Sequence, residues 1–195
     1  MINKLQSKGL KKPVVLILLT VSVLANLILI NAYVGRSREL NTAWRNGTQE
    51  VVQVGIRLLS AYQGNQSPDA DSLTTVNAYT EMLSQQLNSA VALPYGQKII
   101  PFSTVQTVES FINYETSVSK LMQEELKNNG HISTENLKRW KIINDGWHSM
   151  FSLMQDELNK CEPFSPVFKE QTWRKIYVDA TIALNQVEPS PLPEK

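Results

Sequence analysis

Few side chains in this sequence have the type and spacing that catalysis or metal binding requires. The chain contains two histidines, His131 and His148, and one cysteine, Cys161. It has no HExxH, paired CxxC or acidic calcium-loop pattern, no GxSxG nucleophile elbow and no glycine-rich phosphate loop. Helical bundles that hold carboxylate-bridged metals use Glu-x-x-His pairs, which this sequence also lacks. We therefore expect a protein that is not an enzyme and that has no catalytic residue, bound metal or cofactor.

The remaining candidates for reactive groups have ordinary structural explanations. Asp145 and His148 are three residues apart on a predicted helix, so together they could supply two metal ligands. Their predicted position beside the apolar stripe, toward solvent, favours a surface pair instead. Cys161 continues that apolar stripe, and a buried thiol is inert unless an electropositive neighbour lowers its pKa. We interpret Cys161 as a core residue.

Glu115 is the one acidic residue whose position stands out. On the helix predicted over 103–129, one face carries a stripe of apolar side chains, formed by Val108, Phe111, Ile112, Val118 and Met122. A rotation of about 100° per residue places Glu115 at the centre of this stripe. A carboxylate in an apolar interior is unfavourable unless it is paired, hydrogen-bonded or protonated.

Two interpretations of Glu115 follow from this position. In the first, Glu115 is a buried polar or ligand site: it lines a ligand pocket, acts as a proton-linked switch or fixes the packing register of the helices. In the second, which is more ordinary, the stripe is exposed at this level and the carboxylate reaches water. The two interpretations differ in whether Glu115 is buried.

A short basic and aromatic run lies on the following helix. Its residues are Lys138, Arg139, Trp140 and Lys141, a pattern that could contact anionic lipid or a polymer. Trp140 belongs to the apolar stripe of its helix, however, which leaves the three bases on ordinary solvated faces. The four tryptophans are all assigned to the core, because each lies on the apolar face of its helix: Trp44, Trp140, Trp147 and Trp173.

The stretch over residues 14–34 contains no charged residue. Its 21 residues, at about 1.5 Å each, extend about 31 Å as a helix, which matches a hydrocarbon core of about 30 Å. The alternative is a cleaved secretory signal, whose apolar part is normally about 7–15 residues long. Residues 23–25 could form a cleavage site, but cleavage there would leave the apolar residues 27–30 at the new N-terminus. We therefore predict an uncleaved transmembrane helix over 14–34.

Two polar residues near the middle of this span are candidates for helix association. Ser22 and Asn26 are one helical turn apart. An amide surrounded by hydrocarbon needs a hydrogen-bonding partner, and amide contacts between helices favour their association in membranes. The alternative is that the Asn26 amide bonds to its own helix and is simply tolerated.

The charges that flank the span indicate its orientation. Residues 1–13 carry four lysines and no acid, whereas three arginines lie between residues 36 and 45. This small excess of positive charge before the span favours a cytoplasmic N-terminus. A single cysteine is compatible with an oxidising compartment without indicating one. We predict a single-pass protein of the cell membrane, with residues 1–13 as a basic cytoplasmic stub and residues 35–188 as an extracytoplasmic body.

The body is predicted to be entirely helical. No segment shows sustained alternation of apolar and polar residues, which disfavours strands. Helices are predicted over 37–63, 70–92 and 103–129, from Ser133 or Thr134 onward, and from Ser165-Pro166 onward. The fold class is therefore all-α, a single N-terminal transmembrane helix followed by an up-and-down bundle of about five helices, because short connections favour antiparallel neighbours. The proline-rich residues 189–195 are predicted to form a disordered tail.

Several residues are expected to bend or end these helices. The first body helix could continue directly from the span, with Gly35 and Gly47 as places to bend. Ser103, with Gln106 three residues later, forms a capping-box pattern, and Gly130 follows the end of that helix.

The predicted helix 37–63 is apolar over an unusually large part of its circumference. Beside its main apolar stripe lies a second strip, formed by Val52, Ile56 and Leu59. A helix of this kind usually lies centrally in a bundle or has an additional partner. We take Val52, Ile56 and Leu59 as a candidate partner face.

These features predict a membrane-anchored, extracytoplasmic helical protein that binds another membrane or envelope protein or itself. The formal net charge of +1 leaves no strong basic excess, so we expect no nucleic-acid partner. The alternative is a ligand-sensing bundle built around Glu115. Because so few residues precede the span, such a sensor would have to signal through a partner in the membrane.

Overall fold

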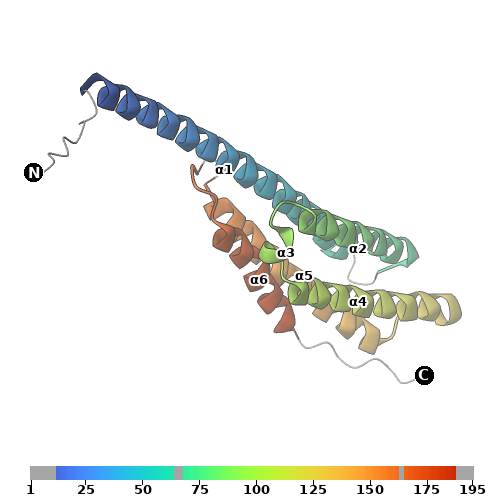
Figure 1. The fold of residues 1–195 in the computed structure, drawn as a ribbon. Helices are drawn as coiled ribbons and strands as arrows, with labels where there is room; N and C mark the ends of the chain where they lie inside the picture. The colour runs from blue at the N-terminus through green and yellow to red at the C-terminus, as the bar shows by residue number, and fades with distance from the viewer. Residues whose placement is uncertain (1–11, 64–67, 163–164, 188–195) are drawn as a thin grey trace, which may run out of the picture.

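The computed structural model describes residues 12–63, 68–162 and 165–187, and these are all-helical (Figure 1). Six helices follow one another without an intervening strand in these described ranges: α1 (Lys12–Gln63), α2 (Ala70–Val91), α3 (Gly96–Ile99), α4 (Phe102–Asn129), α5 (Thr134–Lys160) and α6 (Glu170–Asn185). The all-α prediction is thus confirmed. The predicted tail over 189–195 and nearly all of the basic stub over 1–13 lie outside the described residues.

Helix α1 joins the predicted span to the body without a break. It is 52 residues long and runs through both Gly35 and Gly47 as continuous α-helix. A Cβ atom added at Gly47 would lie 2.9 Å from Leu93 Cδ1 at the end of α2. Gly47 therefore allows α1 to pack closely against Leu93, which follows α2, and it does not end the helix. The two predicted parts form one rod.

The two halves of α1 have opposite environments. Between residues 16 and 33 the large apolar side chains are 54–69% exposed, and this projecting segment extends away from the other helices (Figure 1). It is long and apolar enough to cross a membrane. From Ser37 to Tyr62 one face of α1 is buried against the body.

The body has one core to which α1, α2, α4, α5 and α6 all contribute. All four tryptophans are at most 6% exposed, which confirms their predicted core positions. The packing is close, since a Cβ atom at Gly55 of α1 would overlap the ring of Phe151 on α5. A Cβ atom at Gly146 of α5 would likewise lie 2.7 Å from Phe111 of α4. These contacts define how near the helices approach.

Some helix ends agree with the sequence patterns. Helix α2 ends at Val91, within one residue of its predicted end. Gly130 ends α4 with a φ of 70°, the left-handed conformation in which glycine is favoured. Ser133 caps α5, because its Oγ accepts a hydrogen bond of 3.3 Å from the Asn136 backbone N–H.

Three details of the elements differ from prediction. Helix α4 begins at Phe102 after Pro101, so Ser103 lies inside the helix and does not cap it. Helix α6 begins at Glu170 instead of at Ser165-Pro166, because the preceding segment bonds to α1 and is held in a non-helical conformation. The short helix α3, within the connection after α2, was not expected.

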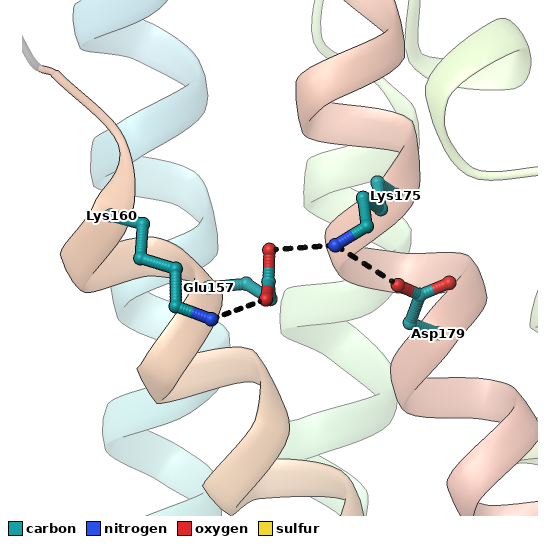
Figure 2. A network of polar contacts seen from close by, with 4 residues as sticks. All are labelled: Glu157, Lys160, Lys175 and Asp179. Atoms are coloured by element: carbon teal, nitrogen blue, oxygen red, sulfur yellow. Dashed lines mark hydrogen bonds and ion pairs between the residues drawn. The ribbon is translucent and has the colours of Figure 1, made fainter.

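An exposed ion network connects α5 to α6. Glu157 lies 2.7 Å from the Nζ of Lys160 on its own helix and 3.1 Å from the Nζ of Lys175 on α6 (Figure 2). Lys175 also lies 3.5 Å from Asp179. The lysine ammonium groups are mostly solvated, so the network contributes little to stability.

Candidate functional site

Glu115 is fully buried at the centre of the body. It is 0% exposed, so the interpretation that its stripe opens to water at this level is wrong. Its Oε1 lies 2.7 Å from Thr80 Oγ1 on α2, and its Oε2 accepts a hydrogen bond of 2.6 Å from Trp147 Nε1 on α5. The carboxyl group is thus bonded on both oxygens.

The helices place Glu115 here through their apolar faces. On α4, Phe111 and Val118 lie about one turn to either side of Glu115 and are buried with it. On α2, Thr80 follows Val76 by four residues in the same buried stripe. Each partner is therefore a polar residue within an otherwise apolar face, and the faces meet at one level of the core.

Helix α1 adds a fourth side chain to this buried polar centre. Tyr62 is 4% exposed. Burial raises the pKa of its hydroxyl, and the neighbouring negative charge of Glu115 raises it further. We define the polar centre as Tyr62, Thr80, Glu115 and Trp147, one residue from each of α1, α2, α4 and α5.

Aromatic contacts hold the Trp147 indole in place. The Phe111 ring meets it edge-on, with ring centroids 4.8 Å apart, and the Phe151 ring stacks on it at 5.7 Å. Pairs of this kind are stabilising beyond the apolar area they bury. The Trp147 N–H is therefore aimed at Glu115 by a rigid aromatic cluster.

Thr80 can bond to either protonation state of Glu115. Its Oγ1 lies 2.9 Å from the Val76 carbonyl oxygen as well as 2.7 Å from Glu115. A hydroxyl has one proton to donate and also accepts. When Glu115 is ionised, Thr80 donates to it; when Glu115 is protonated, the acid donates to Thr80, which in turn donates to Val76. The Glu115 carboxyl group thus keeps its hydrogen bond to Thr80 with or without the proton.

The pKa of Glu115 reflects these opposing influences. Burial raises it from 4.5 to about 7, while hydrogen bonds from Thr80 and Trp147 hold it down, and the nearby Tyr62 side chain acts in the same direction. Both protonation states are therefore populated near neutral pH. The arrangement binds and releases a proton in the interior, and that is the chemistry it can perform.

Four surface grooves of the described residues have none of Tyr62, Thr80, Glu115 and Trp147 in their walls. One of these grooves, of about 730 Å³, lies between α4 and the end of α6, with Phe111, Tyr114 and Leu184 in its wall. Glu115 is not part of that wall. The described residues also contain no group of three or more His, Cys, Asp or Glu side chains that could hold a metal ion.

The candidates in α1 have different environments. Ser22 and Asn26 lie exposed on the projecting segment. Of the proposed partner face, Ile56 is 42% exposed and Leu59 is half-buried. Val52 is 0% exposed, because α1 packs this side against the body, so Val52 belongs to the core and is not available to a partner.

Other residues singled out from the sequence also have definite places. Arg139 is 8% exposed, which contradicts the expectation of a solvated base. Its guanidinium donates to Asn136 Oδ1 at 2.8 Å and lies 3.4 Å from Glu135, so polar partners on its own helix compensate its burial. Cys161 is half-buried at the end of α5, where burial raises its pKa and disfavours the reactive thiolate.

Asp145 and His148 are both exposed on α5, as expected of a surface pair. Asp145 forms an ion pair of 2.6 Å with Lys141. His131 is also exposed, in the turn after α4.

Sequence reasoning missed the partners of Glu115. Trp147 was assigned to the core for its ring, although a buried indole N–H needs an acceptor. Thr80 was overlooked, although a hydroxyl inside an apolar stripe also signals a buried polar contact.

Comparisons of this chain with protein families, curated proteins and solved structures give no match. The proposals below therefore rest on the residues and contacts described above.

Proposed function

We propose that this chain is a membrane-anchored, extracytoplasmic helical-bundle protein that binds another membrane or envelope protein or a second copy of itself, without catalysis. The observation that carries the proposal is the division of α1. Its projecting segment exposes apolar side chains that are 54–69% accessible, whereas its second half is built into the core of the body.

Exposure of this kind is unfavourable in water. Each large apolar side chain gains about 1.5–3 kcal/mol when it leaves water, and the projecting segment carries twelve that are exposed. A bilayer covers them all without any further protein surface. The lysines before the segment support a cytoplasmic N-terminus, so the body lies on the opposite side of the membrane.

Two surfaces of α1 support an interaction role. Within the bilayer, the exposed Asn26 amide favours contact with a polar group of another transmembrane helix. Outside it, the exposed Ile56 of α1 is one of several exposed apolar side chains of the body that are candidates for contact with a partner.

Crosslinking in native membranes tests this proposal. The full chain is expected to remain with the membrane fraction after alkaline extraction and to be captured in a specific complex, with itself or with another envelope protein. External protease on intact cells is expected to digest the body. Release by alkaline extraction would contradict the anchor, and a monomer without a co-purifying partner in mild detergent would contradict the interaction role.

A ligand-sensing bundle is the second proposal, and the buried Glu115 favours it. Ligand binding coupled to this centre would alter the protonation of Glu115 and thereby the packing of four helices. The two proposals are distinguished by Glu115→Gln, which removes the proton-binding group while retaining its shape. An interaction module retains its partner after this change, whereas a sensor of this kind loses its response.

A further inference from the structure

The body begins to cover α1 at the point where the predicted span ends. Tyr33 is 59% exposed, whereas Val34, the last residue of the span, is already half-buried. Ser37, three residues further, is 3% exposed. Part of the body therefore lies directly beside the end of the span, without an intervening linker.

The segment that leads into α6, residues 165–169, is fixed to this part of α1. The buried Asn41 side chain donates hydrogen bonds to the carbonyl oxygens of Ser165 and Val167, at 3.1 and 3.3 Å. Asn41 Oδ1 in turn accepts a hydrogen bond of 3.1 Å from Trp173 Nε1 on α6. In Figure 1 this segment lies beside α1 where the projecting segment joins the body.

Helix geometry places residues 165–169 near the bilayer surface. Asn41 is seven residues beyond Val34, which corresponds to about 10 Å along the helix axis. The polar layer on each side of the hydrocarbon core is about 5–8 Å thick. Asn41 thus lies a few ångströms outside this layer, and side chains of the bonded segment that point toward the membrane can reach the lipid headgroups from there.

The exposed side chains of this segment suit such a position. Val167 is 43% exposed although its backbone is held, and the neighbouring Pro166 and Lys169 are exposed too. Apolar side chains enter the interfacial layer, and a lysine beside them can extend to lipid phosphates. The exposed Glu39 and Glu162 lie near this segment and offset the positive charge of Lys169. The contact therefore does not require anionic lipid, and a zwitterionic bilayer is sufficient to test it.

We propose that residues 165–169 form a second membrane contact, in which Pro166 and Val167 enter the headgroup layer of the same bilayer that holds α1. This inference rests on the proposed membrane span. Two points of attachment, the span and this segment, fix the tilt of α1 in the bilayer and the rotation of the whole protein about the α1 axis. The faces of the body that are open to a partner then have a constant direction relative to the membrane.

Site-directed fluorescence on the full chain tests the contact. In a Cys161→Ser background, single cysteines replace Val167, Ile28 of the span and His131 in the turn that follows α4, at the end of the body remote from the projecting segment (Figure 1). Each variant carries an environment-sensitive fluorophore and is reconstituted in phosphatidylcholine nanodiscs. The lipids carry a nitroxide quencher either on the headgroup or deep in the acyl chain. Circular dichroism checks that each variant is folded.

The expected result is a depth order. The label at Val167 loses its fluorescence with the headgroup quencher, the label at Ile28 with the deep quencher, and the label at His131 with neither. If Val167 behaves like His131 while Ile28 is quenched, the second contact is wrong and the span remains. If Ile28 is not quenched by the deep nitroxide, the membrane span itself is wrong.

Discussion

At the scale of single residues, the polar centre around Glu115 is the unusual feature of this protein. An acid whose pKa is lowered by folding stabilises the protein at high pH. Glu115 has the opposite effect, because burial raises its pKa from 4.5 to about 7. Between those values the folded chain binds more protons at this site than the unfolded chain does. Its contribution to the free energy of unfolding is therefore fully present below about pH 4.5 and is lost as the pH rises to about 7.

Glu115→Gln is expected to abolish this part of the pH dependence. Glutamine resembles the protonated acid, since it can donate to Thr80 and accept from Trp147. The variant and the natural chain should therefore differ little at pH 5, whereas at pH 8 the variant gains stability relative to the natural chain by up to about 3 kcal/mol. Denaturant unfolding in a non-ionic detergent, repeated across pH, measures this difference. A difference that is independent of pH would show that folding leaves the pKa of Glu115 unchanged.

Trp147→Phe is expected to raise the pKa of Glu115 above that of the natural chain. The Trp147 N–H stabilises the ionised carboxylate, and phenylalanine has no donor to replace it. The midpoint of the pH-dependent stability change should move to higher pH. Trp173→Phe is the matched control, because it removes a comparable indole bond, to Asn41, away from Glu115. Equal midpoints in the two variants would contradict the assignment.

At the scale of elements, the proposed membrane attachment depends on α1. Its 52 residues connect the projecting segment directly to the core, so movement of the span is transmitted to the body. The same helix carries Asn26 in the projecting segment and Ile56 on the body. The distance between Asn26 and Ile56 is therefore fixed by the helix, and a partner that contacts both must match it.

The continuity of α1 predicts a rigid junction. Spin labels at positions 28 and 56 are expected to give one narrow distance distribution, centred near 42 Å from the rise of the helix. Gly35→Pro removes a helical hydrogen bond and should broaden and shorten that distribution. Gly35→Ala, whose Cβ atom meets nothing within 4 Å, should leave it narrow. A broad distribution in the natural chain would show that the junction bends.

Association through the span is expected to depend on Asn26. Asn26→Leu removes an amide that can bond across two helices, and such bonds contribute roughly 1 kcal/mol, or about fivefold in the association constant. Energy transfer between labelled copies in lipid vesicles measures the change. Asn31→Leu, near the end of the span, is the control. If Asn26→Leu associates as strongly as the natural chain, the Asn26 amide is satisfied within its own helix or by a different partner protein.

At the scale of the whole molecule, the proposed orientation in the membrane rests on the charges around the predicted span. Four lysines precede the predicted span and three arginines follow it, so the excess of positive charge that favours a cytoplasmic N-terminus is small. A small bias implies that a few substitutions are sufficient to change the topology. The interior of the body plays no part in this choice.

Replacing Lys4, Lys8, Lys11 and Lys12 by glutamine is therefore expected to produce a mixed population, with part of the bodies on the cytoplasmic side. Protease digestion of intact cells measures the protected fraction. Replacing the exposed Arg36 and Arg38 by glutamine should instead leave the body uniformly outside. If the body of the natural protein is protected from protease in intact cells, the proposed orientation is wrong and the body lies on the cytoplasmic side.

Most of the helices of this protein can be predicted from local properties of the sequence. The length and composition of the apolar stretch predict a span, and helical periodicity predicts the five longer helices, because both are local properties of the chain. Gly130 and Ser133 marked helix ends for the same reason. The start of α6 was misplaced because a long-range contact, from Asn41 to the segment before the helix, overrides the local signal of Ser165-Pro166.

Which side chains contact one another depends on how the helices pack, and the sequence pattern does not show this. The pattern placed Glu115 on an apolar face, but it could not show whether that face was covered. Thr80 and Trp147, which bond to it, are 35 and 32 residues away along the chain. Val52 is likewise a core residue and not part of a partner face, because other helices pack against its side of α1. Periodicity fixes the direction of a side chain around its own helix, whereas burial depends on what the rest of the chain places opposite it.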